Sequence, residues 1–236
     1  MGDVEGMMPR ASLSDRDLRG MLRLYLVTDP KLCSQHGLVE TVRDAVQGGV
    51  TIVQLRDKTA TTSALVKMGR DLAADLAGTG VPLIVNDNVE AAIAIGADGL
   101  HVGQGDMKVE QARLLIGPDM LLGLSCETVE DAKTTDPAIV DYIGVSPVFA
   151  TPTKTGHSLA VGFEGLRAIA AAAPVPKVAI GGLKSHHFEA IFENGADGVA
   201  VVSAICGQPD VEAAASALST KIAQVTARRN ILGRRL

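Results

Sequence analysis

Short apolar runs alternate with longer amphipathic stretches from Leu22 onward. Each short run has the length and the Val, Ile and Leu content of a buried strand, and each longer stretch has the periodicity of a helix. This alternation is typical of β/α units, which build a parallel sheet. The predicted strands cover residues 23–27, 51–55, 82–85, 99–102, 121–124, 142–145, 177–180 and 199–202.

Eight such strands favour an α/β fold, a single (β/α)8 TIM barrel with eight parallel strands, and a doubly wound open sheet is the alternative. An internal repeat supports closure, because Gly-rich helix ends stand directly before the second, fourth and eighth strands, at Gly49, Gly96 and Gly195. The first two of these are 47 residues apart and the last two 99 residues apart, so the repeating unit is roughly two β/α pairs. The Gly residues themselves are interpreted as helix caps that turn the chain into the next strand.

The barrel is expected to occupy residues 21–228 as one catalytic domain. Residues 1–20 are charged and mixed in character and do not have the pattern of a signal peptide, so we expect an N-terminal extension that is poorly ordered. Residues 229–236 are expected to form a basic C-terminal tail, to which Arg229, Arg234 and Arg235 contribute.

Composition narrows the choice of partners. The formal net charge of -5 and the pI near 5.5 provide no general attraction to nucleic acid or to an anionic membrane. No apolar run reaches membrane-spanning length, and three widely spaced cysteines form no CxxC pair. We therefore expect a cytoplasmic protein that acts on small molecules, and a homo-oligomer is compatible with the sequence.

Two aspartates follow neighbouring predicted strands. Asp87 comes shortly after the third strand, and Asp106 ends the Gly-rich stretch after the fourth. Because the carboxyl ends of parallel strands share one rim, which carries the functional loops of a β/α barrel, the two carboxylates are expected to meet there. Two hard oxygen ligands with several retained waters suit Mg²⁺ better than a soft metal. The pair therefore predicts a magnesium site.

Cationic side chains are predicted at the same rim. Gln54, Arg56 and Lys58 alternate along the end of the second strand, so they lie on one side of the extended chain. An arginine fork and a mobile lysine suit a polyphosphate bound beside a metal ion. The longest predicted loop, residues 145–157, adds Lys154, which can neutralise charge on a leaving group once the loop closes.

A second anion site is predicted after the seventh and eighth strands. Gly181 and Gly182 leave backbone N–H groups accessible, and barrels often bind a phosphate at this position. No residue is placed by the sequence as an activated nucleophile, because Cys126 has no evident partner. His101, at a strand end, fits a substrate contact and a structural role equally well.

The combination of these segments resembles the thiamine-phosphate synthase family. The resemblance runs in order from about Leu24 to Ile205. The segments that carry it are QLRDK at 54–58, VND at 85–87, HVGQGD at 101–106, GLS at 123–125, PVFATPTK at 147–154, IGG at 180–182 and VSAI at 202–205. It implies a TIM barrel that condenses 4-amino-2-methyl-5-(diphosphooxymethyl)pyrimidine with a carboxylated thiazole phosphate, giving thiamine phosphate and diphosphate.

The resemblance also implies roles for individual residues, with Mg²⁺ as the cofactor on Asp87 and Asp106. The residues implied to act in catalysis are Arg56, Lys58, Ser125 and Lys154. The residues implied to contact the two substrates are Gln54, Leu55, Arg56, Asp57, Lys58, Asn86, Ser125, Thr151, Pro152, Thr153, Lys154, Gly182, Val202 and Ser203. The implied reaction is a dissociative substitution, in which diphosphate departs and the thiazole nitrogen captures a pyrimidine methylene cation.

Two other functions remain open for the same barrel. A thiazole tautomerase, which transfers a proton, would bind only the thiazole phosphate and would not need Arg56, Lys58, Asp87 and Asp106. A thiazole or thiamine phosphate-binding protein would bind its ligand without catalysis. The sequence also departs from the usual family pattern, since Ser146 stands where a Gly commonly precedes the Pro.

Overall fold

The structure is a computed structural model that describes residues 13–151 and 159–233, with side chains described as far as Arg229. Within these residues, eight parallel strands pair in chain order, and β8 pairs with β1 to close a barrel. The strands are β1 Leu24–Val27, β2 Ile52–Leu55, β3 Leu83–Asn86, β4 Gly99–Val102, β5 Leu121–Cys126, β6 Tyr142–Val145, β7 Lys177–Ile180 and β8 Gly198–Val201. The predicted fold class is confirmed, and closure excludes the open sheet.

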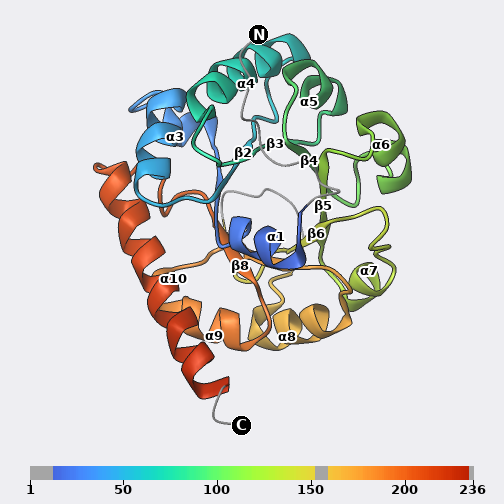
Figure 1. Cartoon of the computed structure of the whole chain (residues 1–236), viewed down its shortest axis with the longest axis vertical. Helices are drawn as coiled ribbons and strands as arrows, with labels where there is room; N and C mark the ends of the chain where they lie inside the picture. Colours follow the sequence, from blue (N-terminus) through green and yellow to red (C-terminus); the bar gives the residue numbers. More distant parts are fainter. Residues whose placement is uncertain (1–12, 152–158, 234–236) are drawn as a thin grey trace.

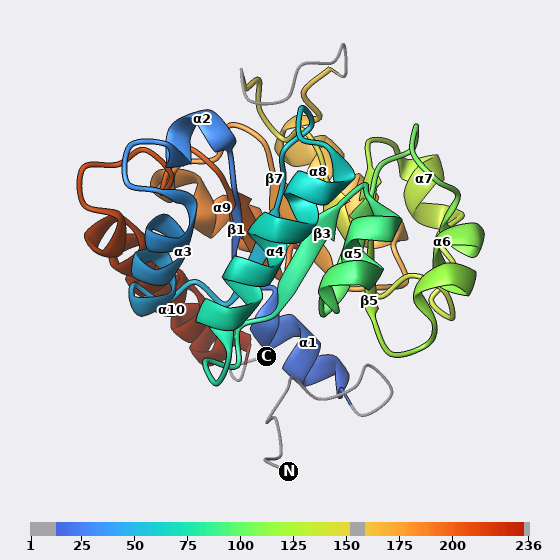
Figure 2. The same cartoon turned by 90° about the horizontal axis from the view of Figure 1, so that it is seen from above.

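The helices surround the strands, as Figure 1 shows in a view along the barrel. Eight of them, α3 to α10, follow the eight strands in the β/α alternation, and α1 and α2 lie at the two ends of the barrel (Figure 2). The helices are α1 Asp15–Met21, α2 Pro30–Cys33, α3 Leu38–Gln47, α4 Thr62–Leu76, α5 Val89–Ile95, α6 Val109–Ile116, α7 Val129–Lys133, α8 Gly162–Ala172, α9 Phe188–Glu193 after the short 3-10 helix η2 Ser185–His187, and α10 Val211–Gly233.

Strand side chains alternate between two cores. On β1, Leu24 and Leu26 pack in the outer core between strands and helices, while Tyr25 lies in a separate cluster inside the barrel. On β2, Val53 belongs to the outer core and Ile52 to the inner cluster. This period of two is the geometry of a strand, and both faces are apolar because both are covered. It also decides which side chains can reach the barrel interior.

The rim at the amino ends of the strands, here called the lower rim, carries a device repeated four times. The residue directly before each even-numbered strand exchanges two hydrogen bonds with the first or second residue of the preceding strand. Its backbone N–H donates to the partner's carbonyl, and its side-chain oxygen accepts from the partner's N–H. The pairs, with the distance from N–H nitrogen to side-chain oxygen, are Leu24 and Thr51 at 3.0 Å, Leu83 and Asp98 at 2.8 Å, Leu122 and Asp141 at 2.7 Å, and Lys177 and Asp197 at 2.9 Å.

This device explains the spacing of about two β/α pairs in the sequence. Each pair supplies an acceptor for a strand N–H at the edge of the ladder. Gly49, Gly96 and Gly195 mark the turns before β2, β4 and β8, and the polar residue two positions later makes the hydrogen bond. Before β6 the aspartate follows Val140 instead of a Gly-containing turn. The polar residue is Thr51 before β2 and an aspartate before β4, β6 and β8.

Helix α1 covers the lower rim. Ser14 caps it, since the Ser14 hydroxyl accepts from the Asp17 N–H at 3.2 Å and Asp17 accepts in return from the Ser14 N–H. Leu18 and Leu22 are buried against the cluster inside the barrel. A capped helix with Leu18 buried on one face and Leu22 buried at its C-cap is ordered by packing.

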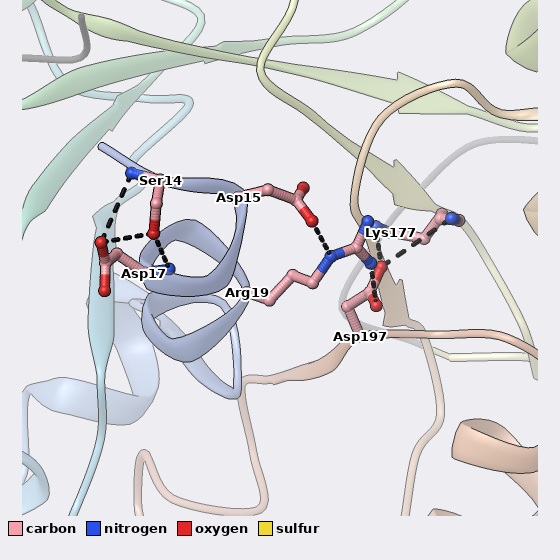
Figure 3. Close-up of polar contacts among 6 residues, drawn as sticks. All are labelled: Ser14, Asp15, Asp17, Arg19, Lys177 and Asp197. Carbon is pink, nitrogen blue, oxygen red and sulfur yellow. Dashed lines mark hydrogen bonds and ion pairs between the residues drawn. The ribbon is translucent and has the colours of Figure 1, made fainter. Parts of the chain in front are cut away.

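An ion pair fixes α1 to the barrel. The Arg19 guanidinium contacts Asp15 one turn away and Asp197 of the lower rim, and the Lys177 ammonium lies 3.9 Å from Asp197 (Figure 3). Residues 14–20 therefore differ from the expected poorly ordered extension, because part of that segment is a folded helix docked on the barrel. Residues 1–12 lie outside the described residues.

A few element boundaries differ from the prediction. β3 continues to Asn86 and β5 to Cys126, so Asn86 and Ser125 lie on strands, and β8 begins and ends one residue earlier than expected. Helix α10 continues to Gly233 and includes the first residues of the predicted basic tail, and residues 234–236 are outside the description. Among the helices that the structure describes, none combines the length and the hydropathy needed to cross a bilayer.

Candidate active site

A cavity of about 400 Å³ opens at the rim formed by the carboxyl ends of the strands, here called the upper rim. All eight strands, or the loops that directly follow them, contribute to its wall. The polar and charged residues of the wall are Tyr25, Gln54, Arg56, Lys58, Asn86, Asp87, His101, Asp106, Ser125, Tyr142, Ser146, Thr151, Lys184 and Ser203. The polar groups predicted at separate strand ends therefore meet in one space.

Asp87 is held in an unusual backbone conformation. Its φ is 60°, the only positive φ among the described residues other than glycine. The Asp87 N–H donates to the His101 carbonyl at 2.8 Å, and the Asn88 N–H donates to the Asn86 carbonyl at 2.7 Å. These bonds hold the turn on both sides, and Asp and Asn tolerate the left-handed region better than most residues. Strained residues of this kind concentrate at functional sites.

Asp106 faces Asp87 across the upper rim. The Gly103 N–H donates to Asp106 Oδ2 at 2.7 Å, which fixes the carboxylate against the turn after β4. Partial burial raises the pKa of Asp106, and a side-chain hydrogen bond with Asp87 and the charge of Asp87 raise it further. The Asp87 carboxylate thus disfavours ionisation of Asp106, and a cation between the two groups would relieve the repulsion.

The donor set fits Mg²⁺ better than it fits a transition metal. The described residues contain no group of three or more His, Cys, Asp or Glu placed to hold a metal ion. Two carboxylates alone would leave several positions for water and phosphate oxygens, which is the usual coordination of protein-bound Mg²⁺. The Lys58 ammonium, 3.1 Å from Asp87 Oδ2, shows that this position already attracts positive charge.

The side chains of residues 54–58, at the end of β2 and directly after it, point alternately toward the cavity and away from it. Gln54, Arg56 and Lys58 line the cavity, as the alternation of an extended strand end requires. The Leu55 side chain is buried in the outer core. Asp57 Oδ1 accepts from the Thr59 N–H at 2.8 Å and its hydroxyl at 2.7 Å, so this carboxylate stabilises its own loop. The side chains of Leu55 and Asp57 therefore point away from the cavity.

The opposite side of the upper rim is built for close approach of the backbone. Gly181 and Gly182 have φ of 104° and 62°, and a Cβ at Gly182 would lie 2.7 Å from the Ala150 carbonyl oxygen. Gly182, Thr151, Val202 and Ser203 all line the cavity. Pro152, Thr153 and Lys154 lie outside the described residues.

Three polar residues that line the cavity were not predicted as site residues from the sequence. Tyr25 and Tyr142 line it from β1 and β6, and Lys184 lines it from the segment after β7. The period of two was the available signal, because it places Tyr25 on the same face as Val27, but a tyrosine within an apolar run also fits a core role. Cys126 is not a candidate nucleophile, because burial raises the pKa of its thiol to about 12.

Comparison with known proteins identifies the family. Residues 24–205 match the family described as thiamine monophosphate synthase. The chain belongs to this family. A thiamine-phosphate synthase of Xanthobacter autotrophicus is 49% identical over 201 residues, covering 85% of this chain and 95% of the relative. The thiamine-phosphate synthase of Azorhizobium caulinodans is 47% identical with the same coverage of both chains.

A solved structure agrees with this assignment. Thiamine phosphate pyrophosphorylase from Pyrococcus furiosus is 35% identical and superimposes with a TM-score of 0.80, covering 88% of this chain and 98% of the other. The family resemblance seen in the sequence is therefore confirmed over nearly the whole barrel, including the segments that form the cavity.

Proposed function

We infer that the chain is a thiamine-phosphate synthase. It condenses 4-amino-2-methyl-5-(diphosphooxymethyl)pyrimidine with a carboxylated thiazole phosphate and releases diphosphate. The observation that carries this function beyond family membership is the meeting of Arg56 and Lys58 with Asp87 and Asp106 in one cavity. Cations beside paired carboxylates are the parts that diphosphate chemistry requires. A thiazole tautomerase would not need them.

The departing diphosphate is assigned to the side of the cavity formed by β2, β3 and β4. Arg56 can bind two phosphate oxygens at once, and the Lys58 ammonium can move from Asp87 to the diphosphate. Asp87 and Asp106 are the residues that would hold Mg²⁺. When bound, the metal ion supplies positive charge next to the leaving oxygens. Lys154 is proposed to add a further cation from the loop after β6.

The organic parts of the substrates are assigned to the remaining wall. Gln54, Asn86 and Ser125, which line the cavity from β2, β3 and β5, are proposed to bind the pyrimidine. Thr151, Gly182 and Ser203 are proposed to bind the thiazole phosphate, together with Thr153 and Val202. Backbone N–H groups near Gly182 can approach a phosphate closely because no side chain intervenes.

The reaction needs no nucleophilic side chain. The bond between the pyrimidine methylene carbon and the diphosphate oxygen breaks, and its electron pair leaves with the diphosphate. The thiazole nitrogen then donates its lone pair to the methylene carbon and forms the new C–N bond. The carboxylate of the thiazole leaves as CO₂, and the electron pair that it leaves on the ring system takes up a proton, which completes thiamine phosphate. The protein contributes by holding both rings in line and by stabilising negative charge on the leaving group. The neutral, buried thiol of Cys126 is consistent with this division of labour.

The direct test is incubation of the purified chain with both substrates and Mg²⁺. Formation of thiamine phosphate and diphosphate in equal amounts is expected, and neither should form when one substrate is omitted. Binding of the thiazole phosphate with tautomer conversion and without diphosphate release would favour the tautomerase. Binding without any conversion would favour a carrier.

A further inference from the structure

Five buried or partly buried polar side chains form a continuous hydrogen-bonded chain under the cavity. Gln54 Nε2 donates to the Tyr25 hydroxyl at 2.9 Å, and the Tyr25 and Tyr142 hydroxyls are 2.8 Å apart. His101 Nδ1 lies 3.2 Å from the Tyr142 hydroxyl, and His101 Nε2 lies 3.0 Å from Ser125 Oγ. The hydrogen-bonded chain of side chains therefore runs from β2 through β1, β6 and β4 to β5.

The barrel is shaped to allow these contacts. Tyr25 and Tyr142 are 2% and 0% exposed and belong to the cluster inside the barrel. A Cβ at Gly123 of β5 would collide with both Tyr142 and His101, and one at Gly144 of β6 would lie 3.4 Å from His101 Cε1. Glycine at these inward positions makes room for the two rings. Burial raises the pKa of both tyrosines well above the usual value, so both remain neutral hydroxyls.

The direction of the hydrogen bonds follows from the first member. Tyr25 accepts from the Gln54 amide, and the only other partner that the described residues offer its hydroxyl is Tyr142. The Tyr25 proton must then point to Tyr142, because a buried donor without an acceptor costs about 1–3 kcal/mol. Tyr142 in turn donates to His101 Nδ1, which places the imidazole proton on Nε2, facing Ser125 Oγ.

This direction determines what the two ends present to a ligand. One N–H of the Gln54 amide donates to Tyr25, which fixes the orientation of the amide and leaves its carbonyl oxygen as the acceptor. Ser125 Oγ accepts from His101, so its own proton is available as a donor. Both residues line the cavity. Gln54 therefore presents a carbonyl acceptor and Ser125 a hydroxyl donor, and the two groups complement an aromatic nitrogen heterocycle that carries an amino group beside a ring nitrogen.

We propose that Tyr25, Tyr142 and His101 are positioning residues that set the hydrogen-bond polarity of Gln54 and Ser125 and so select an aminopyrimidine over the corresponding oxopyrimidine. The amino group donates to the Gln54 oxygen, and the ring nitrogen accepts from Ser125. An oxopyrimidine has the reversed pattern, with a carbonyl acceptor beside a ring N–H donor. This proposal deepens the proposed function and rests on it for the identity of the substrate.

The test compares the affinity of the two pyrimidine diphosphates by calorimetry, in the wild type and in Tyr142→Phe. The wild type is expected to prefer the aminopyrimidine by roughly a hundredfold or more, because the reversed pattern leaves buried polar groups unpaired. Without the Tyr142 hydroxyl, the proton of His101 is no longer confined to Nε2. The hydrogen bond between His101 Nε2 and Ser125 Oγ can then reverse direction, with Ser125 as the donor. The preference should then fall by about tenfold, with kcat within about threefold and KM raised.

A matched control separates polarity from packing. Ile84→Val shortens a buried side chain of the same inner cluster that does not line the cavity. It should lower the melting temperature to a similar small extent and leave the preference unchanged. Gly123→Ala, which crowds the Tyr142 and His101 contact, should reduce the preference as Tyr142→Phe does.

The binding readout keeps the two proposals distinguishable. Unchanged preference in Tyr142→Phe, or an equal loss in Ile84→Val, would overturn the role of the hydrogen-bonded chain. Loss of preference in Tyr142→Phe alone supports that role, even if the wild type makes no thiamine phosphate. In that case the proposed function would fail while the recognition of aminopyrimidines would stand.

Discussion

The two rims of the barrel use aspartate in opposite ways. At the lower rim, Asp98, Asp141 and Asp197 each accept a backbone N–H from the start of the preceding strand. At the upper rim, Asp87 and Asp106 face each other across an open cavity. The lower carboxylates thus stabilise the fold through bonds to the backbone, whereas the upper pair lines a cavity in which a ligand can bind.

The difference shows that hydrogen-bond partners, more than residue type, separate a structural carboxylate from a functional one. Asp98 and Asp106 make the point, because burial raises the pKa of both. For Asp98 the next influence is the Leu83 N–H, which lowers the pKa, whereas for Asp106 it is a second carboxylate, which raises it. Carboxylates perturbed in this way cluster at functional sites, and a bound cation is one way to relieve their repulsion.

The largest expected effect is on stability, at the lower rim. Asp141 is 8% exposed in its side chain, accepts from Leu122 N–H at 2.7 Å and lies 2.9 Å from Arg113. Asp141→Ala should lower the free energy of unfolding by about 3–4 kcal/mol, because it removes one partner of a buried ion pair. Urea denaturation measures this loss. At a temperature where the variant is folded, kcat should stay within about twofold.

Asp87→Asn, at the upper rim, should lower activity and leave stability nearly unchanged, which is the reverse of the result expected for Asp141→Ala. Turnover should fall by about a hundredfold or more, which corresponds to about 3 kcal/mol of transition-state stabilisation. Asparagine tolerates a positive φ, so the turn is kept, and the free energy of unfolding should change by less than about 0.5 kcal/mol. Steady-state kinetics at saturating Mg²⁺ measures the first quantity. Full activity of this variant would remove Asp87 from the metal site.

Leu18→Ala tests helix α1, which closes the lower rim. Leu18 is 9% exposed and packs against the cluster inside the barrel. Its truncation should lower stability by about 2 kcal/mol, at the low end for a leucine, because a helix at the edge of the fold can relax into the space. Activity per folded molecule should be unchanged. A fall in kcat without a fall in melting temperature would mean that α1 acts on the upper rim as well.

The sequence predicted the parts of the molecule that depend on local pattern. Short apolar runs between amphipathic stretches located all eight strands, and the strand ends located Asp87, Asp106, Arg56 and Lys58. Helix α1 was missed because seven residues with one strong cap form a helix only when Leu18 has a barrel to pack on. The capping box of Ser14 and Asp17 was the signal that could have found it.

The hydrogen-bonded chain in the barrel could not be predicted from the sequence. Tyr25 and Tyr142 are separated by 117 positions, and nothing local indicates that their hydroxyls meet. Closure of the barrel brings β1 and β6 to opposite walls of one interior, and Gly123 leaves the space between His101 and Tyr142. Such contacts depend on the whole sheet, which is why sequence pattern described the rim better than the floor of the cavity.

The contrast between the rims is tested most directly by calorimetric titration of inorganic diphosphate, with and without Mg²⁺. In the wild type, Mg²⁺ should strengthen diphosphate binding. In Asp106→Asn this strengthening should be lost, with affinity at least about tenfold lower, while Asp98→Asn, the same change at the lower rim, should bind within about twofold of the wild type. Equal Mg²⁺-dependent binding by Asp106→Asn and the wild type would contradict the assignment of the upper carboxylates to the metal.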